Sequence, residues 1–491
     1  MTPGWALISN ATVVDGTRSE PTGPTSVLIE GDRIKALGPE AELRAMVPRE
    51  AGGSMRVSDA RGRYVMPGLI DAHCHMTYGD SYTQEEQDLY TSVESRTLRA
   101  AWNVKRVLRA GVTSLSQPGG SYYIGVALRE AIARGMVLGP RMRTAGRYIT
   151  TSNGLTDWYP EDVGVPDGSI GTLANTPAEM IDNVRRQVKN GVDFIKLADS
   201  PFGEYQAFTS DELKQIADLA HQLGKKVTIH ARGSAEVSAA VAAGFDWIMH
   251  GNIMTDEVVE RLAASGIPLV PTLLLLANSA DYGELVGTPA PFRDGCRRML
   301  DKTAETLHRA HAAGVTFALG TDAGFAVTPY GEWHARELEL LMEYAGLSAQ
   351  EALQAGTANG ARTVGLEGQV GEVRPGLLAD LLIVRENPLA DIRSLLRHSN
   401  IEAVFVGGRQ IAFDGSEETP WPNERSITYA SDTLTYGLVH GGAGPSPERS
   451  LPIAGRARSM AKEVAHEISR AGSAAAVASA AADAGQRGVQ S

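Results

Sequence analysis

The sequence predicts an α/β fold: a (β/α)8 TIM barrel together with a small β-sandwich domain built from both ends of the chain. Two observations predict this arrangement. Short apolar runs alternate with amphipathic helical segments through the middle of the chain, which is the pattern of repeated β–α units around a parallel sheet. Both ends instead carry β-like runs without helical periodicity.

The two chain ends are predicted to form one β domain. Trp5–Val13 and Thr25–Leu37 are separated by Gly, Pro, Asp and Thr residues, which favour turns. A similar pattern returns at Ala379–Val384 and Ile401–Ile411. We therefore expect residues 1–65 and 370–420 to form a composite β-sandwich domain.

The middle of the chain, residues 66–369, is predicted to be the TIM barrel. No Gly-x-Gly-x-x-Gly opens a helix after the first strand, which argues against the alternative of a dinucleotide-binding doubly wound sheet. The alternating segments are Asp193–Leu197, Ser210–Leu223, Lys226–His230, Ser234–Ala243, Asp246–His250, Thr255–Ala264, Ile267–Leu276, Cys296–Ala313 and Thr316–Thr321. Residues 421–491 lose this periodicity, and we expect a partly flexible C-terminal extension with at most one helix, around Arg456–Arg470.

Composition favours a cytoplasmic protein that acts on a small molecule. The chain has 491 residues, with 46 Lys and Arg against 58 Asp and Glu, so its net charge of −12 repels polyanions and indicates no nucleic-acid partner. Its two cysteines, Cys74 and Cys296, cannot form a disulfide framework and are expected to be free. The N-terminal residues show neither a signal peptide nor a membrane anchor.

Residues that can bind a metal follow one predicted strand after another. Reactive groups of a β–α barrel lie at the carboxyl ends of its strands, so these positions are the ones to inspect. The residues found there are His73, His75, Lys196, His230, His250 and Asp322. His73 and His75 are two apart on a strand, so both imidazoles can reach one ion while Cys74 faces the other way. Each of these residues alone has a structural alternative, but their regular order favours a metal site.

Lys196 and Asp322 each have two possible roles. Lysine is almost never buried without a partner, yet Lys196 stands in the apolar run Phe-Ile-Lys-Leu-Ala. It either forms an ion pair, for example with Asp199, or has a lowered pKa that leaves a neutral amine for carbon dioxide to convert to a carbamate. Asp322, between Gly-Thr and Ala-Gly, suits a carboxylate beside a metal-bound water, or else a turn.

These motifs resemble the amidohydrolase superfamily. The resemblance rests on Met66-Pro-Gly-Leu-Ile-Asp-Ala-His-Cys-His75, Phe194-Ile-Lys-Leu, His230-Ala, Ile248-Met-His-Gly and Leu319-Gly-Thr-Asp-Ala-Gly324, and it extends from about Ala6 to Ile411. The most similar branch contains imidazolonepropionase-like proteins, prolidases and carboxypeptidases, ochratoxin-degrading amidases, and phenylurea and molinate hydrolases. The resemblance implies a homo-oligomer as well.

The resemblance further implies a metal-dependent hydrolase. His73, His75, a carboxylated Lys196 and Asp322 would hold one divalent ion, and Lys196, His230 and His250 a second. A hydroxide bridging the ions would attack the carbonyl, and Asp322 would pass the water's proton to the leaving nitrogen. The alternative is a mononuclear centre in which Lys196 and His250 orient the water or substrate. Zinc is expected, with iron, cobalt or manganese as alternatives.

Departures from the family pattern bear on the substrate. Thr151-Ser-Asn-Gly154 stands where peptidase-like members often have Thr-Gly-Gly-His, and Tyr330-Gly331 stands where they often have His-Gly. This weakens a dipeptidase reading and leaves Asn153 and Tyr330 as candidate substrate contacts. Further candidates for substrate contact are Arg232, which could bind a carboxylate or pair with a glutamate, and Tyr123. Apolar residues near strand ends, namely Thr272–Ala277, Tyr282, Tyr122, Trp158 and Tyr159, are candidate walls of the pocket.

The sequence therefore predicts cleavage of an amide, urea or carbamate C–N bond, other than a peptide bond, in an apolar or aromatic small molecule. A prolidase-like dipeptidase or carboxypeptidase is one alternative, and a deaminase is another. The deaminase is disfavoured because His230-Ala-Arg-Gly233 lacks the His-Ala-Gly-Glu pattern of adenosine deaminase relatives. From a different class, an inactive barrel acting as a binding protein is disfavoured because such relatives usually lose metal ligands.

Overall fold

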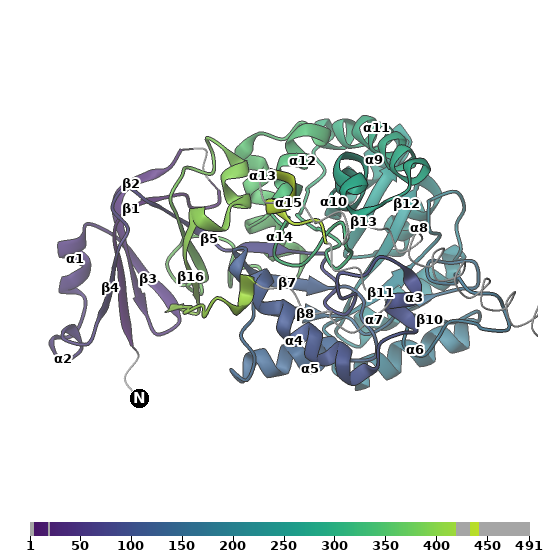
Figure 1. Ribbon diagram of the computed structural model, residues 1–491, viewed down its shortest axis with the longest axis horizontal. Helices are drawn as coiled ribbons and strands as arrows, with labels where there is room; N and C mark the ends of the chain where they lie inside the picture. The colour runs from purple at the N-terminus through teal and green to yellow at the C-terminus, as the bar shows by residue number, and fades with distance from the viewer. Residues whose placement is uncertain (1–3, 18–19, 419–432, 441–491) are drawn as a thin grey trace, which may run out of the picture.

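The computed structural model describes residues 4–17, 20–418 and 433–440 and shows an α/β fold with two regions (Figure 1). One region is a mixed β-sheet to which both ends of the chain contribute. The other consists of parallel strands with helices packed around them. Within the described residues no helix combines the length and the apolar character needed to cross a membrane.

The mixed sheet joins the N-terminal strands to strands near the other end of the chain. Its eight strands are β1 (Trp5–Val13), β2 (Thr22–Glu30), β3 (Arg33–Gly38), β4 (Arg56–Asp59), β5 (Tyr64–Pro67), β15 (Leu381–Val384), β16 (Ile401–Val406) and β17 (Arg409–Gln410). β5 makes the connection, since it pairs with β1 in parallel and with β15 antiparallel. Ile8, Val27, Leu381 and Phe405 belong to one buried apolar cluster, so strands from both parts of the chain share one sheet and one core.

The predicted run Thr25–Leu37 is two strands rather than one. The chain turns at Gly31, whose φ of 66° lies in the left-handed region that glycine adopts without strain. β2 and β3 then pair antiparallel, with Glu30 opposite Arg33. Two short helices, α1 (Glu40–Ala45) and α2 (Arg49–Gly52), follow, and Leu43 of α1 packs against Trp5, Leu7 and Leu28 on the outer face.

The parallel strands lie in two sheets. The first contains β6 (Leu69–Asp71), β7 (Val112–Gln117) and β8 (Arg141–Thr144). The second contains β9 (Tyr148–Thr150), β10 (Gly171–Leu173), β11 (Phe194–Ala198), β12 (Lys226–Gly233), β13 (Trp247–Ile253) and β14 (Leu269–Val270). A backbone bond runs between the two sheets, since the Asp193 amide beside β11 donates to the Thr144 carbonyl of β8 over 2.8 Å. The Ala72 amide after β6 donates to the Leu319 carbonyl of the segment Thr316–Thr321 over 2.8 Å.

Helices alternate with these strands and surround them (Figure 1). The longer helices are α4 (Val93–Arg109), α5 (Ile124–Ala133), α6 (Pro177–Lys189), α7 (Ser210–Gln222), α8 (Ser234–Ala243), α9 (Asp256–Ser265), α10 (Leu274–Tyr282), α11 (Ala290–Ala312) and α12 (Arg336–Ala345). The shorter ones are α3 (Gln84–Asp88), α13 (Ala349–Ala355), α14 (Ala358–Thr363) and α15 (Tyr436–His440). Short 3-10 helices lie at Gly283–Val286, Ile392–Leu396, His398–Asn400 and Ser416–Glu418.

Two predicted strands differ from the structure. Of the apolar run Ile267–Leu276, only Leu269–Val270 is a strand, and α10 begins at Leu274. The cause is tertiary: the buried Glu337 carboxylate accepts the backbone N–H groups of Leu273 and Leu274 and caps the start of the helix. Thr316–Thr321 forms no regular ladder and has one isolated bridge, from Phe317 to Leu269.

Part of the predicted C-terminal extension packs on the parallel-strand region. Trp333 donates a hydrogen bond through Nε1 to the Leu434 carbonyl over 2.5 Å, and the rings of Trp333 and Tyr436 lie 5.7 Å apart. The rest of the extension, including the helix expected around Arg456–Arg470, lies outside the described residues.

Candidate metal centre

The cluster begins with the two histidines that follow β6. Nε2 of His73 and Nε2 of His75 lie 3.0 Å apart, and Oδ1 of Asp322 is 3.4 Å and 3.2 Å from them. All three residues are at least nine-tenths buried, and their ligand atoms lie close enough to hold one ion. Cys74 between them faces the other way and is fully buried, with Sγ 3.8 Å from Met76 Sδ. The prediction placed both histidines on a strand, whereas β6 ends at Asp71 and the pair follows it, with the two imidazoles nevertheless facing one way and Cys74 the other.

Each of these imidazoles is held through its other nitrogen. His75 donates from Nδ1 to the Gly119 carbonyl over 2.8 Å, and Nδ1 of His73 lies 3.0 Å from Thr272 Oγ1. A histidine that donates through Nδ1 carries its lone pair on Nε2. Both Nε2 lone pairs are thus available to a cation at the centre of the cluster, which is how metal-binding histidines are usually oriented.

β11, β12 and β13 add Lys196, His230 and His250 to the same place. The His230 and His250 rings are 4.3 Å apart, and the His73 and His250 rings 5.3 Å. His230 Nε2 and His250 Nδ1 are buried and have no hydrogen-bond partner among the described residues. Lys196 is 2% exposed, with Nζ 2.7 Å from Met249 Sδ.

The ion pair considered for Lys196 is replaced by other contacts. Oδ1 of Asp199 accepts the backbone N–H groups of Ser200 and Ala207, over 2.9 Å and 2.5 Å. Burial lowers the pKa of Lys196 to about 7, although Asp322 opposes this shift. A neutral amine, the form that carbon dioxide can modify, is therefore accessible near neutral pH.

Burial sets the charge of the other groups. It lowers the pKa of His73, His230 and His250 well below the usual value, so these rings are neutral and can donate lone pairs. Burial acts to raise the pKa of Asp322, but His73 and His75 outweigh it and the net pKa is lowered. His73, His230 and His250 are therefore neutral nitrogen donors beside the Asp322 carboxylate.

The backbone is strained around the cluster. His250, Thr272 and Asp322 have φ values of 77°, 59° and 54°, in the left-handed region that residues with a side chain rarely adopt. Such strain, on the order of 1–3 kcal/mol per residue, persists only where surrounding contacts enforce it, and it clusters at functional sites. The left-handed conformation of His250 and Thr272 was not predicted from the sequence.

A buried network beneath the cluster was missed by the sequence analysis. Oδ1 of Asp71 accepts the backbone N–H groups of His73 and Thr321 over 3.0 Å and 3.2 Å. Oδ2 lies 2.6 Å from Thr321 Oγ1 and 2.8 Å from His334 Nδ1. Asp71 stands two residues before His73 in the quoted motif and could have been suspected, whereas His334 gave no signal.

The cluster opens into a cavity of about 220 Å³, whose lining is largely apolar apart from the cluster. All six predicted metal-site residues line it, and so does Arg232. Trp158 and Leu275, two of the predicted apolar wall residues, also line the cavity. The lining residues not anticipated are Tyr78, Gln84, Tyr148, Leu155, Thr156, Ile170, Pro201, Phe202, Phe292 and Phe325.

Three predicted substrate contacts lie elsewhere. Tyr330 is fully buried beneath the cluster, where its hydroxyl bonds the His75 carbonyl and accepts the Gly79 N–H over 3.1 Å. Asn153 occupies an exposed left-handed turn and accepts a hydrogen bond through its carbonyl from Tyr205. Tyr123 precedes α5 and packs beside Gly146, outside the cavity lining. Tertiary packing, which spacing along the chain does not reveal, separates these residues from the cavity.

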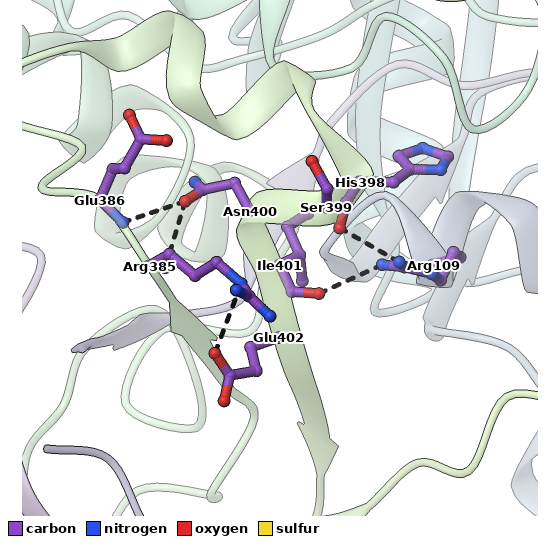
Figure 2. Close-up of a pocket in the computed structure, with 8 residues that line it drawn as sticks. All are labelled: Arg109, Arg385, Glu386, His398, Ser399, Asn400, Ile401 and Glu402. Atoms are coloured by element: carbon purple, nitrogen blue, oxygen red, sulfur yellow. Dashed lines mark hydrogen bonds and ion pairs between the residues drawn. The ribbon is translucent and has the colours of Figure 1, made fainter. Parts of the chain in front are cut away.

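A larger hollow, of about 500 Å³, lies between α4 and β16 (Figure 2). Its charged groups are engaged with one another or with backbone: Arg385 pairs with Glu402 at 3.5 Å, and Arg109 donates to the carbonyls of His398 and Ile401. The hollow is shallow and open and contains none of the predicted site residues. We therefore place the chemistry at the smaller cavity.

Clustered imidazoles and a carboxylate lie at the carboxyl ends of parallel strands, which is where the reactive groups of TIM-barrel enzymes are found. The model of the Amidohydrolase family matches residues 64–411, and the chain belongs to this family of hydrolases. Its solved relatives give it a TIM-barrel-like α/β fold.

Sequence and structure comparisons agree with this assignment. Ochratoxinase from Aspergillus niger is 29% identical over 430 residues, covering 82% of this chain and 85% of that protein. A crystal structure of the same A. niger enzyme has a TM-score of 0.72 at 26% identity, covering 84% of this chain and 96% of that one. A Xaa-Pro dipeptidase with bound methionine in its active site has a TM-score of 0.73 at 27% identity, covering 83% of this chain and all of that one.

Proposed function

We propose that this protein is a metal-dependent amidohydrolase that cleaves an amide-type C–N bond of a small, apolar or aromatic molecule. The observation that carries the proposal is the convergence of His73, His75 and Asp322 beside His230, His250 and Lys196 in one buried cavity. The parallel strands support a closed (β/α)8 barrel as its scaffold, because backbone bonds join the first strand to the segment Thr316–Thr321.

The residues fit divalent ions. Two buried imidazole nitrogens face each other at 3.0 Å, and neither bears the proton needed for a bond between them when both rings donate through Nδ1. The unpartnered nitrogens of His230 and His250 are further donors whose burial is costly without a partner. A cation between these atoms would satisfy them, and mixed nitrogen and oxygen ligation suits zinc, with iron, cobalt or manganese as alternatives.

In the binuclear form that we favour, His73, His75, Asp322 and a Lys196 carboxylated by carbon dioxide would hold one ion, and Lys196, His230 and His250 would hold the other. Ions there would supply Lewis-acid chemistry, polarising the substrate carbonyl and lowering the pKa of water. In the mononuclear alternative, Lys196 and His250 position the water or substrate instead.

Residues of the chain itself supply the proton transfer and the apolar surroundings of the reaction. The lowered pKa of Asp322 keeps this residue a carboxylate, so it can take a proton from water and deliver it to the leaving nitrogen. The apolar lining excludes bulk water and so strengthens the electrostatic interactions inside the cavity.

The substrate class follows from the lining. Apolar and aromatic side chains surround the cluster, which suits an amide, urea or carbamate with an apolar part. The A. niger ochratoxinase is consistent with this reading, and the Xaa-Pro dipeptidase keeps a peptidase as the second candidate. We also propose a cytoplasmic homo-oligomer, with residues 1–65 and 370–420 as one domain and 66–369 as the catalytic one.

Metal content per chain, measured on protein purified with bicarbonate, tests this function. We expect close to two ions in the wild type and a loss of both metal and hydrolysis in Lys196→Ala and His250→Ala. His308→Ala, on the exposed side of α11, is the matched control and should keep both. One ion that is unaffected by Lys196→Ala would establish the mononuclear form, and absence of bound metal would contradict the proposed function.

A further inference from the structure

The cavity beside the histidine cluster has an apolar lining that continues out to the protein surface. Deep in the cavity, Tyr148 and Ile170 are 2% and 3% exposed and belong to one buried apolar cluster. Trp158, Phe202 and Phe292 line the same cavity but are 37%, 57% and 55% exposed, which places them at its mouth. One continuous apolar track therefore leads from the histidine cluster to the surface.

The three aromatic residues at the mouth come from three separate segments. Trp158 lies between β9 and β10, Phe202 lies between β11 and α7, and Phe292 lies in the first turn of α11. Only the fold brings these side chains to one place. Exposed apolar side chains that gather beside a cavity are typical of a surface that binds an apolar group.

The loop that carries Phe202 is held in place by its neighbours. Gly203 has a φ of 81°, and a Cβ there would lie 2.6 Å from the backbone nitrogen of Gly233, so the loop is packed against the end of β12. The Tyr205 hydroxyl donates to the Asn153 carbonyl over 2.6 Å, which joins this loop to the one after β9. Phe202 is thus held at the mouth, and a surface formed in advance loses little conformational entropy when it binds a ligand.

The cavity itself is too small for a ligand of ordinary size. Its volume is about 220 Å³. Cavities that enclose a drug-sized ligand usually measure about 300–1,000 Å³, so a molecule of that size would extend beyond this one. When the scissile carbonyl lies at the histidine cluster, a long apolar group must leave through the mouth and lie on the aromatic side chains there.

Acidic residues around the mouth distinguish among possible apolar partners. Glu161 and Asp162 are exposed on the loop after β9, and Glu204 is exposed on the loop after β11. These charges would repel an anionic membrane surface. A second copy of the chain that packed the same face against itself would place like charges together. The neutral apolar group of a small molecule meets neither obstacle.

From this arrangement we propose that the substrate carries an extended neutral apolar chain, which leaves the cavity between Trp158, Phe202 and Phe292. Phe202 and Phe292 are then specificity-determining residues, because they cover methylene groups that the cavity does not accommodate. This inference rests on the proposed function. It narrows the substrate class to amides, ureas or carbamates with a long alkyl or alkylaryl group.

A binding series that needs no turnover tests the apolar track. N-alkylmethanesulfonamides are neutral, resemble an amide and resist hydrolysis. A fully buried methylene group increases affinity roughly fourfold, and a half-buried one about twofold. Calorimetry on the holoenzyme should therefore show that affinity rises about tenfold or more from the N-hexyl to the N-decyl compound. A series that is flat over this range in the wild type would overturn the inference.

Substitutions at the mouth assign the gain to particular residues. The double variant Phe202→Ser, Phe292→Ser should reduce the gain from N-hexyl to N-decyl to about threefold or less. The double variant Phe202→Leu, Phe292→Leu should restore most of it, because leucine keeps an apolar surface. Met136→Ser is the control, since Met136 is 76% exposed and lies between α5 and β8, at the amino end of that strand. A gain that survives both serine substitutions would overturn the assignment.

Two further measurements separate this inference from the proposed function and from contacts between copies. Release of 4-nitroaniline from its butanoyl or decanoyl amide supports the proposed function, and absence of release from both would contradict it. A higher kcat/KM for the decanoyl amide, lost in the serine double variant, supports the inference, whereas equal values for the two amides would overturn it. Sedimentation decides the third case, because a change of oligomeric state in the serine double variant would assign Phe202 and Phe292 to an interface between copies and overturn the inference.

Discussion

Thr272 Oγ1 lies 3.0 Å from Nδ1 of His73 and ties that imidazole to the strained segment after β14. Thr272 Oγ1 can in turn donate to the Val270 carbonyl at 3.3 Å, so it acts as the acceptor toward His73. The contact fixes which nitrogen of His73 faces the cavity. Orientation of a metal ligand by a neighbouring acceptor is a general device in metal sites.

Thr272→Val should weaken metal binding while leaving the fold intact. Valine keeps the β-branched shape but removes the acceptor, and loss of such a partner typically costs about 10- to 100-fold in metal affinity. Competition with a chelator measures the effect. Thr97→Val on α4, whose hydroxyl bonds only its own helix backbone, serves as control, and equal metal affinity in all three proteins would contradict the assigned role.

Asp71→Asn should destabilise the protein and disturb metal retention together. His334 Nε2 accepts the Gly331 N–H, so its Nδ1 carries the proton and donates to Asp71. Both Asp71 oxygens then face donors only, and the amide group of asparagine would meet two of them. We expect a loss of about 2–4 kcal/mol in the free energy of unfolding. A denaturant titration that shows no change would refute this hydrogen-bond assignment.

Glu337→Ala should loosen the start of α10. The variant leaves the N–H groups of Leu273 and Leu274 unsatisfied in a buried place, which costs about 1–3 kcal/mol for each such group. Hydrogen exchange should show faster opening at Leu273 and Leu274 than in the wild type. Glu339→Ala on the same helix is the control, because Glu339 does not contact that segment in the hydrogen bonds described.

Tyr330→Phe tests whether this hydroxyl positions His75 or binds substrate. Because the hydroxyl bonds the His75 carbonyl and the Gly79 N–H, we expect a stability loss of about 1 kcal/mol and weaker metal retention. KM should change little. A raised KM at unchanged metal content would instead place the hydroxyl at the substrate.

Asp199→Asn should stabilise the protein at high pH only. Burial raises the pKa of Asp199 to about 7, and Glu236 adds to the shift, while the unfolded value is near 3.8. The folded state therefore binds more protons between these values, and wild-type stability falls as the pH rises through this window.

Asparagine cannot ionise and keeps the two bonds accepted by Oδ1. We expect Asp199→Asn to exceed the wild type by about 1–3 kcal/mol at pH 8 and to show no such advantage at pH 5. Chemical denaturation at both pH values checks this, and an advantage of the same size at both would count against an ionised, buried Asp199.

The sequence alone determined the chemistry-bearing positions of the cluster. Lys196 stands within an apolar run, the other five residues, His73, His75, His230, His250 and Asp322, follow or end one, and parallel strands bring their carboxyl ends to one side. The period of two along a strand also determined that His73 and His75 face one way and Cys74 the other. The pairing of the chain ends was likewise visible as a β-like pattern interrupted by a long α/β segment.

Only the tertiary structure decided what surrounds these positions. The sequence pattern predicted that Tyr330 and Asn153 contact the substrate. In the structure, packing buries Tyr330 beneath the cluster and exposes Asn153 to solvent. His334 joins the site, and Glu337 shapes its edge, through contacts with segments more than 60 residues away. The local sequence pattern predicts which residues share a face of a strand. Long-range contacts depend instead on how helices and loops pack against one another. Because the local pattern does not contain this packing, prediction from the sequence ends there.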